Sequence, residues 1–448
     1  MKTKLSKIAV AVLMAAGLST VAIADTVTSS IRGNVATEAG NTFPAATVTI
    51  THTPSGTVSR TTANENGAFS ARGLRVGGPY SITISGDGFQ TVKIDDVYLS
   101  LDQVFSLPVL VETQDTSNVL TVTGRRQGLQ SFSNEGLSTS LGLQALQEVA
   151  SIDRDIIDAA LLDPFTAVNV QTGGKKELTI AGANNRFNSL TIDGVALNDR
   201  FGLNANGYPT QRSPISYDAI ESLSIQSAPY DVEYNGFTGG TINAVTKSGT
   251  NEFKGSVGYY FADDSTIGDS SGDDEFDFTF EEETFVGTFG GPIIEDKLFF
   301  FVSYDKYEEI APLNTGPLGS GALNIRQDIT AADVAEVSQI VSDVWGFDIG
   351  DFKKGPAADE KILANIDWNI NDSHRAKFTY INTEGNGIRE QNGNNFLASD
   401  NTLGASSAWY DRSEKVESFI GHLFSDWTSD FSTEIKIANT TQATGQNS

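Results

Sequence analysis

One ten-residue segment in the C-terminal half of the chain alternates strictly in polarity. Apolar side chains occupy every second position, Ile362, Ala364, Ile366, Trp368 and Ile370, and between them stand Lys361, Leu363, Asn365, Asp367 and Asn369. Because successive side chains of a strand point to opposite faces, this alternation predicts a strand with one apolar and one mostly polar face. A lipid-facing strand of a transmembrane β-barrel has this pattern, and so does a strand of a soluble β-sandwich.

The lengths of the connections distinguish these two structures. Six further strands are predicted at 252–261, 283–290, 297–308, 374–383, 415–425 and 432–440. The segments 262–282, 309–360 and 384–414 are long, and they alternate with the short segments 291–296, 371–373 and 426–431. Outer-membrane barrels have long extracellular loops and short periplasmic turns. We therefore expect residues 250–448 to form the first strands of a transmembrane antiparallel β-barrel.

The predicted barrel is incomplete. Transmembrane barrels that enclose a folded domain of the same chain, called a plug, have about 22 strands. Seven strands cannot close around a domain of that kind. The chain is therefore expected to be the N-terminal fragment of a longer protein.

The N-terminus has the pattern of a cleaved signal peptide over residues 1–24. Lys2, Lys4 and Lys7 precede an apolar stretch at 8–18, and Ala22-Ile23-Ala24 fits a cleavage site. The apolar stretch is too short for a spanning helix. Export without a later apolar helix is what an outer-membrane barrel of a Gram-negative bacterium requires.

Composition excludes several classes of function. The chain has no cysteine, so disulfides and zinc ribbons are excluded. Its three histidines are scattered, and no metal site is predicted. With 57 acidic and 30 basic residues, the net charge is −27, which argues against binding nucleic acid.

Residues 28–111 are rich in short alternating runs, such as 47–50 and 80–84, separated by turn residues such as Asn66-Gly67. This spacing predicts a small antiparallel β-sandwich. The segment resembles the carboxypeptidase-regulatory-like domain, which implies a transthyretin-like β-sandwich related to carbohydrate-binding folds, without catalytic residues. A spacer role in the periplasm is expected, with glycan binding as the alternative.

Residues 112–135 are polar and predict a linker. Within it lies a short β-prone segment, Val119, Leu120, Thr121, Val122, Thr123 and Gly124. An exposed extended segment can add as a strand to the sheet edge of a partner. The alternative is an ordinary closing strand of the sandwich. Beyond the linker, apolar spacings of three to five residues over 137–163 predict helical turns that end at Asp163-Pro164.

Residues 136–248 contain Ile192-Asp193-Gly194-Val195, the run 219–225, Ala228-Pro229-Tyr230 and the run 239–247, in that order. This segment resembles the α+β plug domain of a TonB-dependent outer-membrane receptor. Residues 290–301 are similar to a stretch of the Oar-like subgroup, which joins all three domains. The resemblance implies that 119–124 is a TonB box that binds TonB in the periplasm, and that the barrel meets outer-membrane lipid.

The resemblance also implies that upper plug loops face an extracellular ligand. The candidate contacts are Asn198, Asp199, Arg200, Phe201, Asn204, Asn206 and Tyr208, and the alternative is that they fill the barrel interior. Loop residues Asp263, Asp264, Asp269, Asp273, Asp274, Glu275 and Asp277 are rich in oxygen ligands, but their order is not that of a calcium loop. No catalytic constellation and no cofactor motif are found, so no enzyme activity is expected.

The leading hypothesis is energy-coupled uptake of a peptide, oligosaccharide or metal chelate across the outer membrane. The first alternative is an outer-membrane adhesion or secretion-assisting barrel with a carbohydrate-binding-like periplasmic domain. The second alternative is a periplasmic carbohydrate-binding protein without a membrane part.

Overall fold

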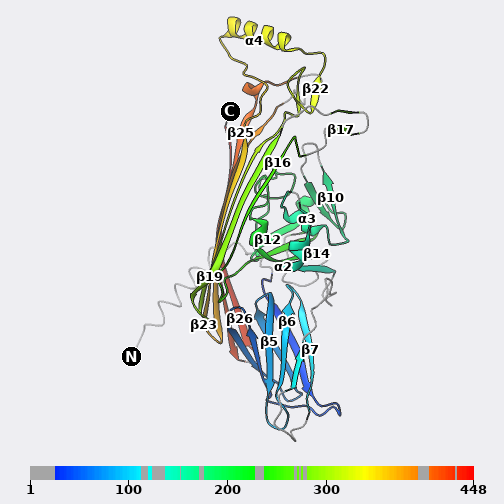
Figure 1. Cartoon of the computed structure of the whole chain (residues 1–448), viewed down its shortest axis with the longest axis vertical. Coiled ribbons are helices and arrows are strands. Elements are labelled where there is room, and N and C mark those ends of the chain that lie inside the picture. Colours follow the sequence, from blue (N-terminus) through cyan, green and yellow to red (C-terminus); the bar gives the residue numbers. More distant parts are fainter. Residues whose placement is uncertain are drawn as a thin grey trace, which may run out of the picture.

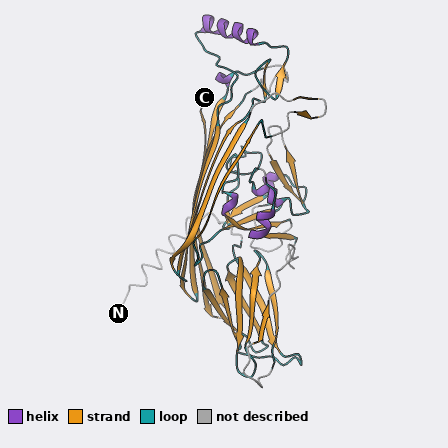
Figure 2. Cartoon of the chain, in the orientation of Figure 1, coloured by secondary structure: helices purple, strands orange, loops and turns teal. Residues whose placement is uncertain are grey.

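The computed structural model describes residues 26–112, 120–123, 137–151, 153–170, 176–227, 237–266, 270–271, 274–275, 280–391, 403–428 and 431–447. These residues form three units (Figure 1). A β-sandwich lies at one end, a tall curved sheet rises beside it, and an α+β unit lies against one face of that sheet. Figure 2 shows that strands dominate all three units. The predicted signal peptide lies outside the described residues.

The N-terminal unit is a β-sandwich. One sheet holds β4 (Ala68–Leu74), β1 (Ser29–Ala36) and β7 (Val104–Leu110), in that order. The other holds β3 (Thr57–Thr62), β2 (Thr47–His52), β5 (Gly77–Ser85), β6 (Val92–Leu99) and β8 (Leu120–Thr123). Alternate side chains are buried between the sheets, among them Ile31, Ile50, Ile82 and Ile84.

The sandwich is mixed, and the prediction of a wholly antiparallel one was wrong. β1 pairs parallel with β7, and β6 pairs parallel with β8. The pairs β1–β4, β2–β3, β2–β5 and β5–β6 are antiparallel. Parallel neighbours need a crossover, and here the chain passes through the other sheet before it returns. Polarity alternation shows which face of a strand is buried but not the direction of its neighbour.

The middle unit is a five-stranded sheet with two short helices. Its strand order is β13 (Val195–Ala196), β12 (Ser189–Ile192), β15 (Thr241–Thr246), β14 (Ile220–Gln226) and β9 (Ser138–Gly142). Helices α2 (Leu143–Glu148) and α3 (Ile156–Ala160) share a core with this sheet. The unit also contains the hairpin of β10 (Thr166–Val170) and β11 (Lys176–Ile180) and the 3-10 turns η1 (Asn185–Phe187) and η2 (Tyr217–Ala219).

The helical prediction over 137–163 is confirmed in part. α2 and α3 are present, and Asp155 caps α3 by accepting a hydrogen bond from the Ile157 amide. The beginning of the segment is different, because Ser138–Gly142 pairs antiparallel with β14. Pairing with a strand more than eighty residues away, at Ser222–Gln226, overrides the local helical spacing.

All seven predicted barrel strands are confirmed; six are longer than expected, and the first has the expected length but begins two residues later. They are β16 (Lys254–Asp263), β19 (Glu281–Ile294), β20 (Leu298–Ile310), β23 (Ala357–Asn371), β24 (His374–Arg389), β25 (Tyr410–Thr428) and β26 (Phe431–Asn447). They form one antiparallel sheet in sequence order. The sheet is open among the described strands, with β16 and β26 at its edges.

The two faces of this sheet differ as the alternation predicts. On β23, Ile362, Ile366 and Trp368 are 37%, 38% and 50% exposed. Leu363, Asn365 and Asp367 lie between them and are buried. The apolar face therefore points away from the middle unit, and the polar face points toward it.

Long connections lie at one end of the sheet and short ones at the other, where the sandwich docks. The loop from β20 to β23 carries β21 (Thr315–Pro317), β22 (Asn324–Arg326) and α4 (Ala331–Trp345). The short strands β17 (Ser270–Ser271) and β18 (Asp274–Glu275) belong to the first long loop, and η3 (Ser406–Ala408) to the third. No helix within the described ranges is long and apolar enough to cross a membrane.

We predict that Ile366→Arg destabilises the protein folded in phosphatidylcholine vesicles and lowers its free energy of unfolding by about 2–4 kcal/mol, because a charge on the apolar face of a barrel strand must enter lipid. Urea titration of the vesicle-inserted protein measures this change. Ile366→Leu is the control and leaves the titration midpoint unchanged. Equal midpoints for the arginine and leucine variants would show that this face meets water.

Candidate functional site

The turn between β12 and β13 is the point where the middle unit is fastened to the tall sheet. Asp193 and Gly194 form this turn with positive φ angles of 45° and 67°. Glycine adopts that conformation freely, and aspartate tolerates it better than most residues. Asp193 has 0% exposure, so its carboxylate depends wholly on protein partners.

Four groups meet the Asp193 carboxylate. The Thr246 amide donates to Oδ1 at 2.9 Å, and the Thr246 hydroxyl donates to Oδ2 at 2.7 Å. From β24, the Thr379 hydroxyl donates to Oδ2 at 2.8 Å, and Lys377 Nζ lies 3.0 Å from the same oxygen. Half of the partners therefore come from the sheet wall.

Two more strands of the wall contact the backbone of the same turn. His422 Nε2 on β25 lies 3.1 Å from the carbonyl oxygen of Asp193, and Lys436 Nζ on β26 donates to the Gly194 carbonyl at 3.1 Å. Burial by itself would raise the pKa of Asp193, but Lys377 and the hydrogen bonds from Thr246 outweigh it and hold that pKa below its usual value. The carboxylate therefore stays charged at neutral pH, and the ion pair stays intact.

A second set of contacts lies nearer the long loops. Asn204 of the middle unit donates to Glu414 Oε1 at 3.0 Å and accepts from Arg412 Nη2 at 3.0 Å. Arg412 also donates to the Leu203 carbonyl at 3.0 Å and forms an ion pair with Glu414. Arg412 and Glu414 are among the first residues of β25, which begins at the long-loop end of the sheet. These contacts are therefore nearer the long loops than the contacts of Asp193.

The seven predicted ligand contacts fall into two groups: five whose side chains form hydrogen bonds within the protein, and two that are exposed to solvent. The first group stabilises the conformation of the loop. Asp199 accepts from the amides of Phe201, Gly202 and Asn204, and the Asn198 side chain bridges the Leu190 amide and the Asn188 carbonyl. Asn206 bonds the Tyr208 amide and the Gln211 carbonyl.

Asn204 and Tyr208 are buried, with exposures of 4% and 2%. The Tyr208 hydroxyl donates to Asp155 Oδ1 at 2.6 Å. Burial and the neighbouring Asp155 raise the pKa of Tyr208, so the phenol stays protonated. Only Arg200 and Phe201 of the seven are exposed, and Phe201 is 57% exposed. The ligand-binding role stays a prediction, and these two side chains are the ones open to solvent.

Several contacts between the middle unit and the wall were not predicted. The Arg212 guanidinium lies 3.4 Å from the centroid of the Tyr307 ring and 3.6 Å from Asp359, and Ser216 donates to Asp305 Oδ2 at 2.7 Å. The sequence did indicate that the wall has polar groups to pair, because Lys361 and Asp367 lie on the polar face of a predicted strand. It did not indicate which residue of the middle unit would contact each of them.

The sandwich contacts the short turns of the wall and the middle unit. Thr57 accepts from Asn369 Nδ2 at 2.9 Å, the Gly73 carbonyl accepts from Arg375 at 2.6 Å, and Arg60 pairs with Asp372. On the other side, Gln226 donates to Asp102 at 3.1 Å. Beside these polar contacts lies an apolar cluster of Val27, Val76 and Leu101 from the sandwich and Val245 from the middle unit, with Phe424 of the wall packed against it.

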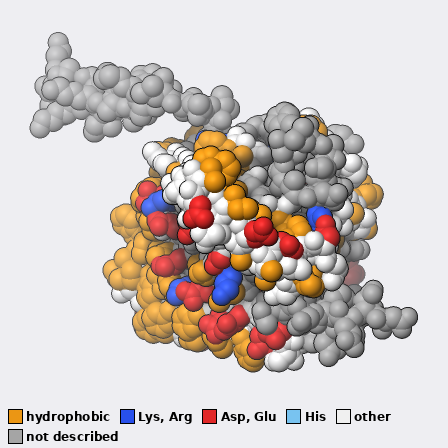
Figure 3. Space-filling view, turned by 90° about the horizontal axis from the view of Figure 1, so that it is seen from above, with side chains coloured by type: hydrophobic (Ala, Val, Ile, Leu, Met, Phe, Trp, Pro, Cys, Tyr) orange, Lys and Arg blue, Asp and Glu red, His pale blue; other side chains and the backbone are white. Residues whose placement is uncertain are grey.

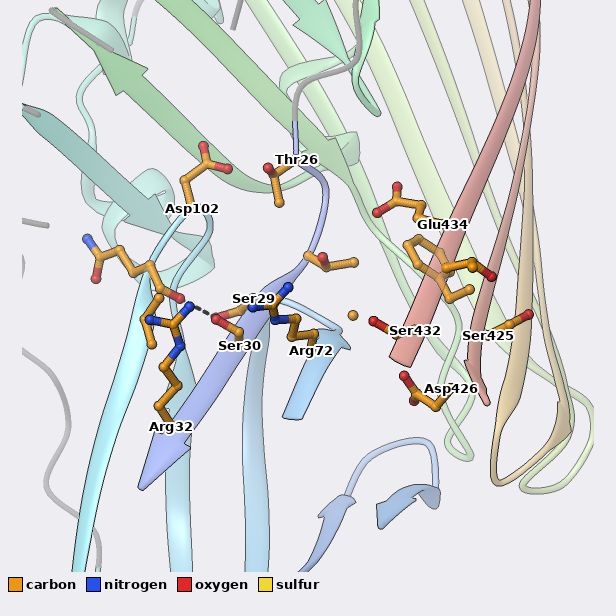
Figure 4. A pocket seen from close by; sticks show the side chains of 16 residues that line it. Thr26, Ser29, Ser30, Arg32, Arg72, Asp102, Ser425, Asp426, Ser432 and Glu434 are labelled. Atoms are coloured by element: carbon orange, nitrogen blue, oxygen red, sulfur yellow. Dashed lines mark hydrogen bonds between the residues drawn. The ribbon is translucent and has the colours of Figure 1, made fainter. Parts of the chain in front are cut away.

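A cavity of about 410 Å³ separates the sandwich from the ends of β25 and β26 (Figure 4). Ser29, Ser30, Arg32 and Arg72 line one side, and Ser425, Asp426, Ser432 and Glu434 line the other. Ser29 Oγ donates to the Gln103 carbonyl at 3.0 Å. No histidine or cysteine is among the residues that line the cavity.

The candidate metal and TonB-binding segments are only partly described. Within the described ranges, no group of three or more His, Cys, Asp or Glu side chains is placed to hold a metal ion. Of the Asp-rich loop, Asp269, Asp273 and Asp277 lie outside those ranges. Leu120–Thr123 of the candidate TonB box forms β8 at the edge of the sandwich, whereas Val119 and Gly124 lie outside the described residues.

We predict that Lys377→Met destabilises the middle unit by about 3–5 kcal/mol, because it leaves the buried Asp193 carboxylate without its counter-ion. Urea unfolding of the detergent-solubilised protein, followed by tryptic cleavage within 138–246, measures the loss. Lys415→Met is the matched control. Lys415 lies on the next strand and pairs with Glu384, but both side chains are about half exposed. The control leaves the midpoint unchanged, and equal midpoints for both variants would contradict the role given to Asp193.

Three family models match the chain. The Carboxypeptidase regulatory-like domain matches residues 30–112, the TonB-dependent Receptor Plug Domain matches residues 138–241, and an Outer membrane beta barrel domain matches residues 245–317. The order and extent of the matches follow the sandwich, the middle unit and the start of the tall sheet.

Two curated proteins that match this chain by sequence are named as TonB-dependent proteins. The TonB-dependent transporter Oar of Myxococcus xanthus is 32% identical over 170 residues, which cover 35% of this chain and 15% of that protein. A probable TonB-dependent siderophore receptor, PirA of Acinetobacter baumannii, is 29% identical over 31% of this chain and 18% of its own length. The outer membrane transporter YddB of Escherichia coli superposes with a TM-score of 0.48 at 12% identity, over 68% of this chain and 38% of that one.

The matched regions thus span less than a fifth of either relative compared by sequence. All three family models nevertheless fall in the order that the structure shows. The sandwich, the plug and the first strands of an outer-membrane barrel place this chain among the TonB-dependent receptors of the Gram-negative outer membrane, in the Oar-like group.

Proposed function

We propose that the protein takes part in energy-coupled uptake of an extracellular ligand across the outer membrane. The observation that carries this proposal is the plug itself. It is held against the polar face of the wall at two levels, by Asp193 near the short turns and by Asn204 near the long loops. A folded domain held at both levels by polar contacts, together with the apolar cluster that it shares with the wall, would block the pore until it is displaced.

The ligand first meets the long-loop side, where Arg200 and Phe201 are open to solvent. The candidate ligand classes are a peptide, an oligosaccharide and a metal chelate. No bond is made or broken in this function. The ligand must bind the two plug states with different affinity, because a ligand that binds both equally shifts no equilibrium.

TonB is the proposed partner on the other side. Leu120–Thr123 pairs with β6 in register from Val92↔Leu120 to Asp95↔Thr123, as the outermost strand of its sheet. A strand at a sheet edge has one free row of backbone donors and acceptors, which a partner strand can use. The pairing also matches the alternative that this segment closes the sandwich, and the two roles are compatible at one edge.

Force applied at this segment would reach β9 first. The chain runs from Thr123 to Ser138, where β9 is the outermost strand of the plug sheet. Among the described strands, β9 pairs only with β14, over five residues, and in sheet order it is far from the Asp193 turn. Pulling would therefore open the plug at the edge that is not fastened by Asp193.

The alternative function is surface adhesion or assistance to secretion, with the sandwich binding a glycan or a protein. The polar cavity beside β1 and β4 is the feature that favours a binding role for the sandwich. That function does not need the segment 119–124.

We predict that deleting residues 119–124 abolishes binding of the purified periplasmic domain of TonB to the detergent-solubilised protein, measured by biolayer interferometry. A Val122→Pro variant weakens binding at least tenfold, because proline removes a backbone donor from the strand. The control is an equally long deletion of 126–131 in the same linker, which keeps binding intact. Undiminished TonB binding after removal of 119–124 would reject coupled uptake through this segment and favour the adhesion or secretion role.

A further inference from the structure

Two buried ion pairs join the wall to different units, and they lie next to each other. Lys377 of β24 pairs with Asp193 of the plug at 3.0 Å. Asp367 of β23 pairs with Arg75 of the sandwich, whose Nη2 lies 3.4 Å from Asp367 Oδ1. Asp367 and Lys377 are direct partners in the register of the two strands. The wall therefore supplies one acid and one base at a single position, and a different unit pairs with each.

The acid and the base of the wall can also pair with each other. Side chains directly opposite in an antiparallel pair have Cβ atoms about 4.5–5.5 Å apart, so a lysine reaches an aspartate across the two strands. Here Lys377 instead contacts Asp193 and the Thr246 hydroxyl, both at 3.0 Å. Arg75, Asp193, Asp367 and Lys377 all line one cavity of about 470 Å³. The long side chain of Lys377 therefore has space to turn from one carboxylate to the other.

Asp367 depends on Arg75 to balance its charge. Among the described residues, Arg75 is the only base that forms an ion pair with Asp367, and no donor there makes a hydrogen bond to Asp367 Oδ2. A buried carboxylate that loses its cation is strongly unfavourable. Removal of Arg75 would therefore leave Asp367 in need of another cation, and Lys377 is the base directly opposite.

Arg375 is a second base near Asp367, but its contacts hold it elsewhere. Its guanidinium lies 4.5 Å from the centroid of the Phe424 ring, and Phe424 is its register partner on β25, the strand on the other side of β24 from β23. Arg375 also donates to the Gly73 carbonyl of the sandwich at 2.6 Å. Lys377 is therefore better placed than Arg375 to pair with Asp367.

Burial gives these ion pairs their importance. The side chains of Arg75, Asp367, Lys377 and Asp193 are 10%, 4%, 11% and 1% exposed. At the long-loop end, by contrast, red acidic and blue basic side chains stand on the surface among apolar ones (Figure 3). Ion pairs on a surface contribute little because water screens them, whereas removing one partner of a buried pair is costly. An exchange of partners among the four buried groups therefore changes the free energy that holds the plug to the wall.

We propose that Asp193 of the plug and Asp367 of the wall compete for Lys377, and that Arg75 of the sandwich decides the outcome. While the sandwich is docked, Arg75 balances Asp367, and Lys377 stays on Asp193. When the sandwich moves away, Lys377 turns to Asp367, and the plug loses the counter-ion of its buried turn. This inference rests on the proposed function, because it supplies the step that releases the plug at the Asp193 level.

The position of Arg75 connects this exchange to the candidate TonB-binding segment. Arg75 lies two residues before β5, and the Tyr80 hydroxyl of β5 donates to the Arg75 carbonyl at 2.8 Å. β5 pairs with β6, which pairs with Leu120–Thr123. A pull on Leu120–Thr123 therefore acts on the sheet that holds Arg75, and it would draw Arg75 away from Asp367.

The test is amide hydrogen exchange, measured by mass spectrometry on the full chain in maltoside micelles. The Thr246 amide donates to Asp193, so its exchange rate reports on the buried turn. We expect Arg75→Met to speed exchange of this amide about tenfold, because it frees Asp367 to take Lys377.

The matched control is Arg60→Met. Arg60 also joins the sandwich to the wall, through its ion pair with Asp372, but the two side chains are 51% and 60% exposed. An exposed pair contributes little, so the Thr246 amide exchanges at the wild-type rate in this variant.

The double variant Arg75→Met with Asp367→Asn separates competition from simple loss of docking. It removes the competing carboxylate, so Lys377 stays on Asp193, and the Thr246 amide returns to the wild-type rate. If Arg75 only attached the sandwich, removing Asp367 as well would restore nothing.

Three outcomes would overturn the proposal. They are a wild-type rate in Arg75→Met alone, fast exchange that persists in the double variant, and fast exchange that extends to β14 in the plug core. TonB binding depends on 119–124 and is unchanged in all these variants. Loss of coupled uptake and failure of this exchange of partners are therefore distinguishable.

Discussion

The polar face of the tall sheet is buried, and this constraint organises the rest of the molecule. Asn365 and Thr379 point toward the plug, and both have an exposure of 0%. Buried polar groups are costly unless they find hydrogen-bond partners. The plug supplies such partners, for example the Thr246 hydroxyl that accepts from Asn365 at 2.8 Å. Wall and plug are therefore each incomplete without the other.

The plug is attached to the wall by both polar and apolar contacts. Its own core is apolar and contains Leu141, Ile156, Leu223 and Ile225, all almost fully buried. The wall residues Phe301, Leu363, Ile381, Val416 and Ile420 belong to the same buried apolar cluster. Polar contacts through Asp193, Arg212 and Asn204 add to this packing. Separation of plug and wall would therefore expose apolar surface to water as well as exchange polar partners.

The two ends of the molecule present different chemistry. At the short-turn end, the sandwich meets the wall and the plug through hydrogen bonds, ion pairs and a small apolar cluster, beside a polar cavity. At the long-loop end, Leu313, Ala322 and Trp409 form a small buried core, and α4 beyond it has no buried residue.

The pattern of residues along the chain is sufficient to predict the wall. Strand period is two, so the alternation at Ile362–Ile370 and the alternation of loop lengths predicted seven strands, their faces and their order. It also identified the plug, by resemblance. It did not distinguish exposed from buried residues in the loop 198–211, because polar composition is the same for both. The buried Tyr208 donates a hydrogen bond to Asp155, which is 53 residues away in the chain. The buried Asn204 donates one to Glu414, which is 210 residues away.

These roles follow from the packing of distant segments, as do the edge strand at Ser138–Gly142 and the parallel pairing of β1 with β7. Each depends on a partner that is distant in the chain. Local patterns specify which side of an element is apolar, but the partner that covers that side is chosen when the elements pack.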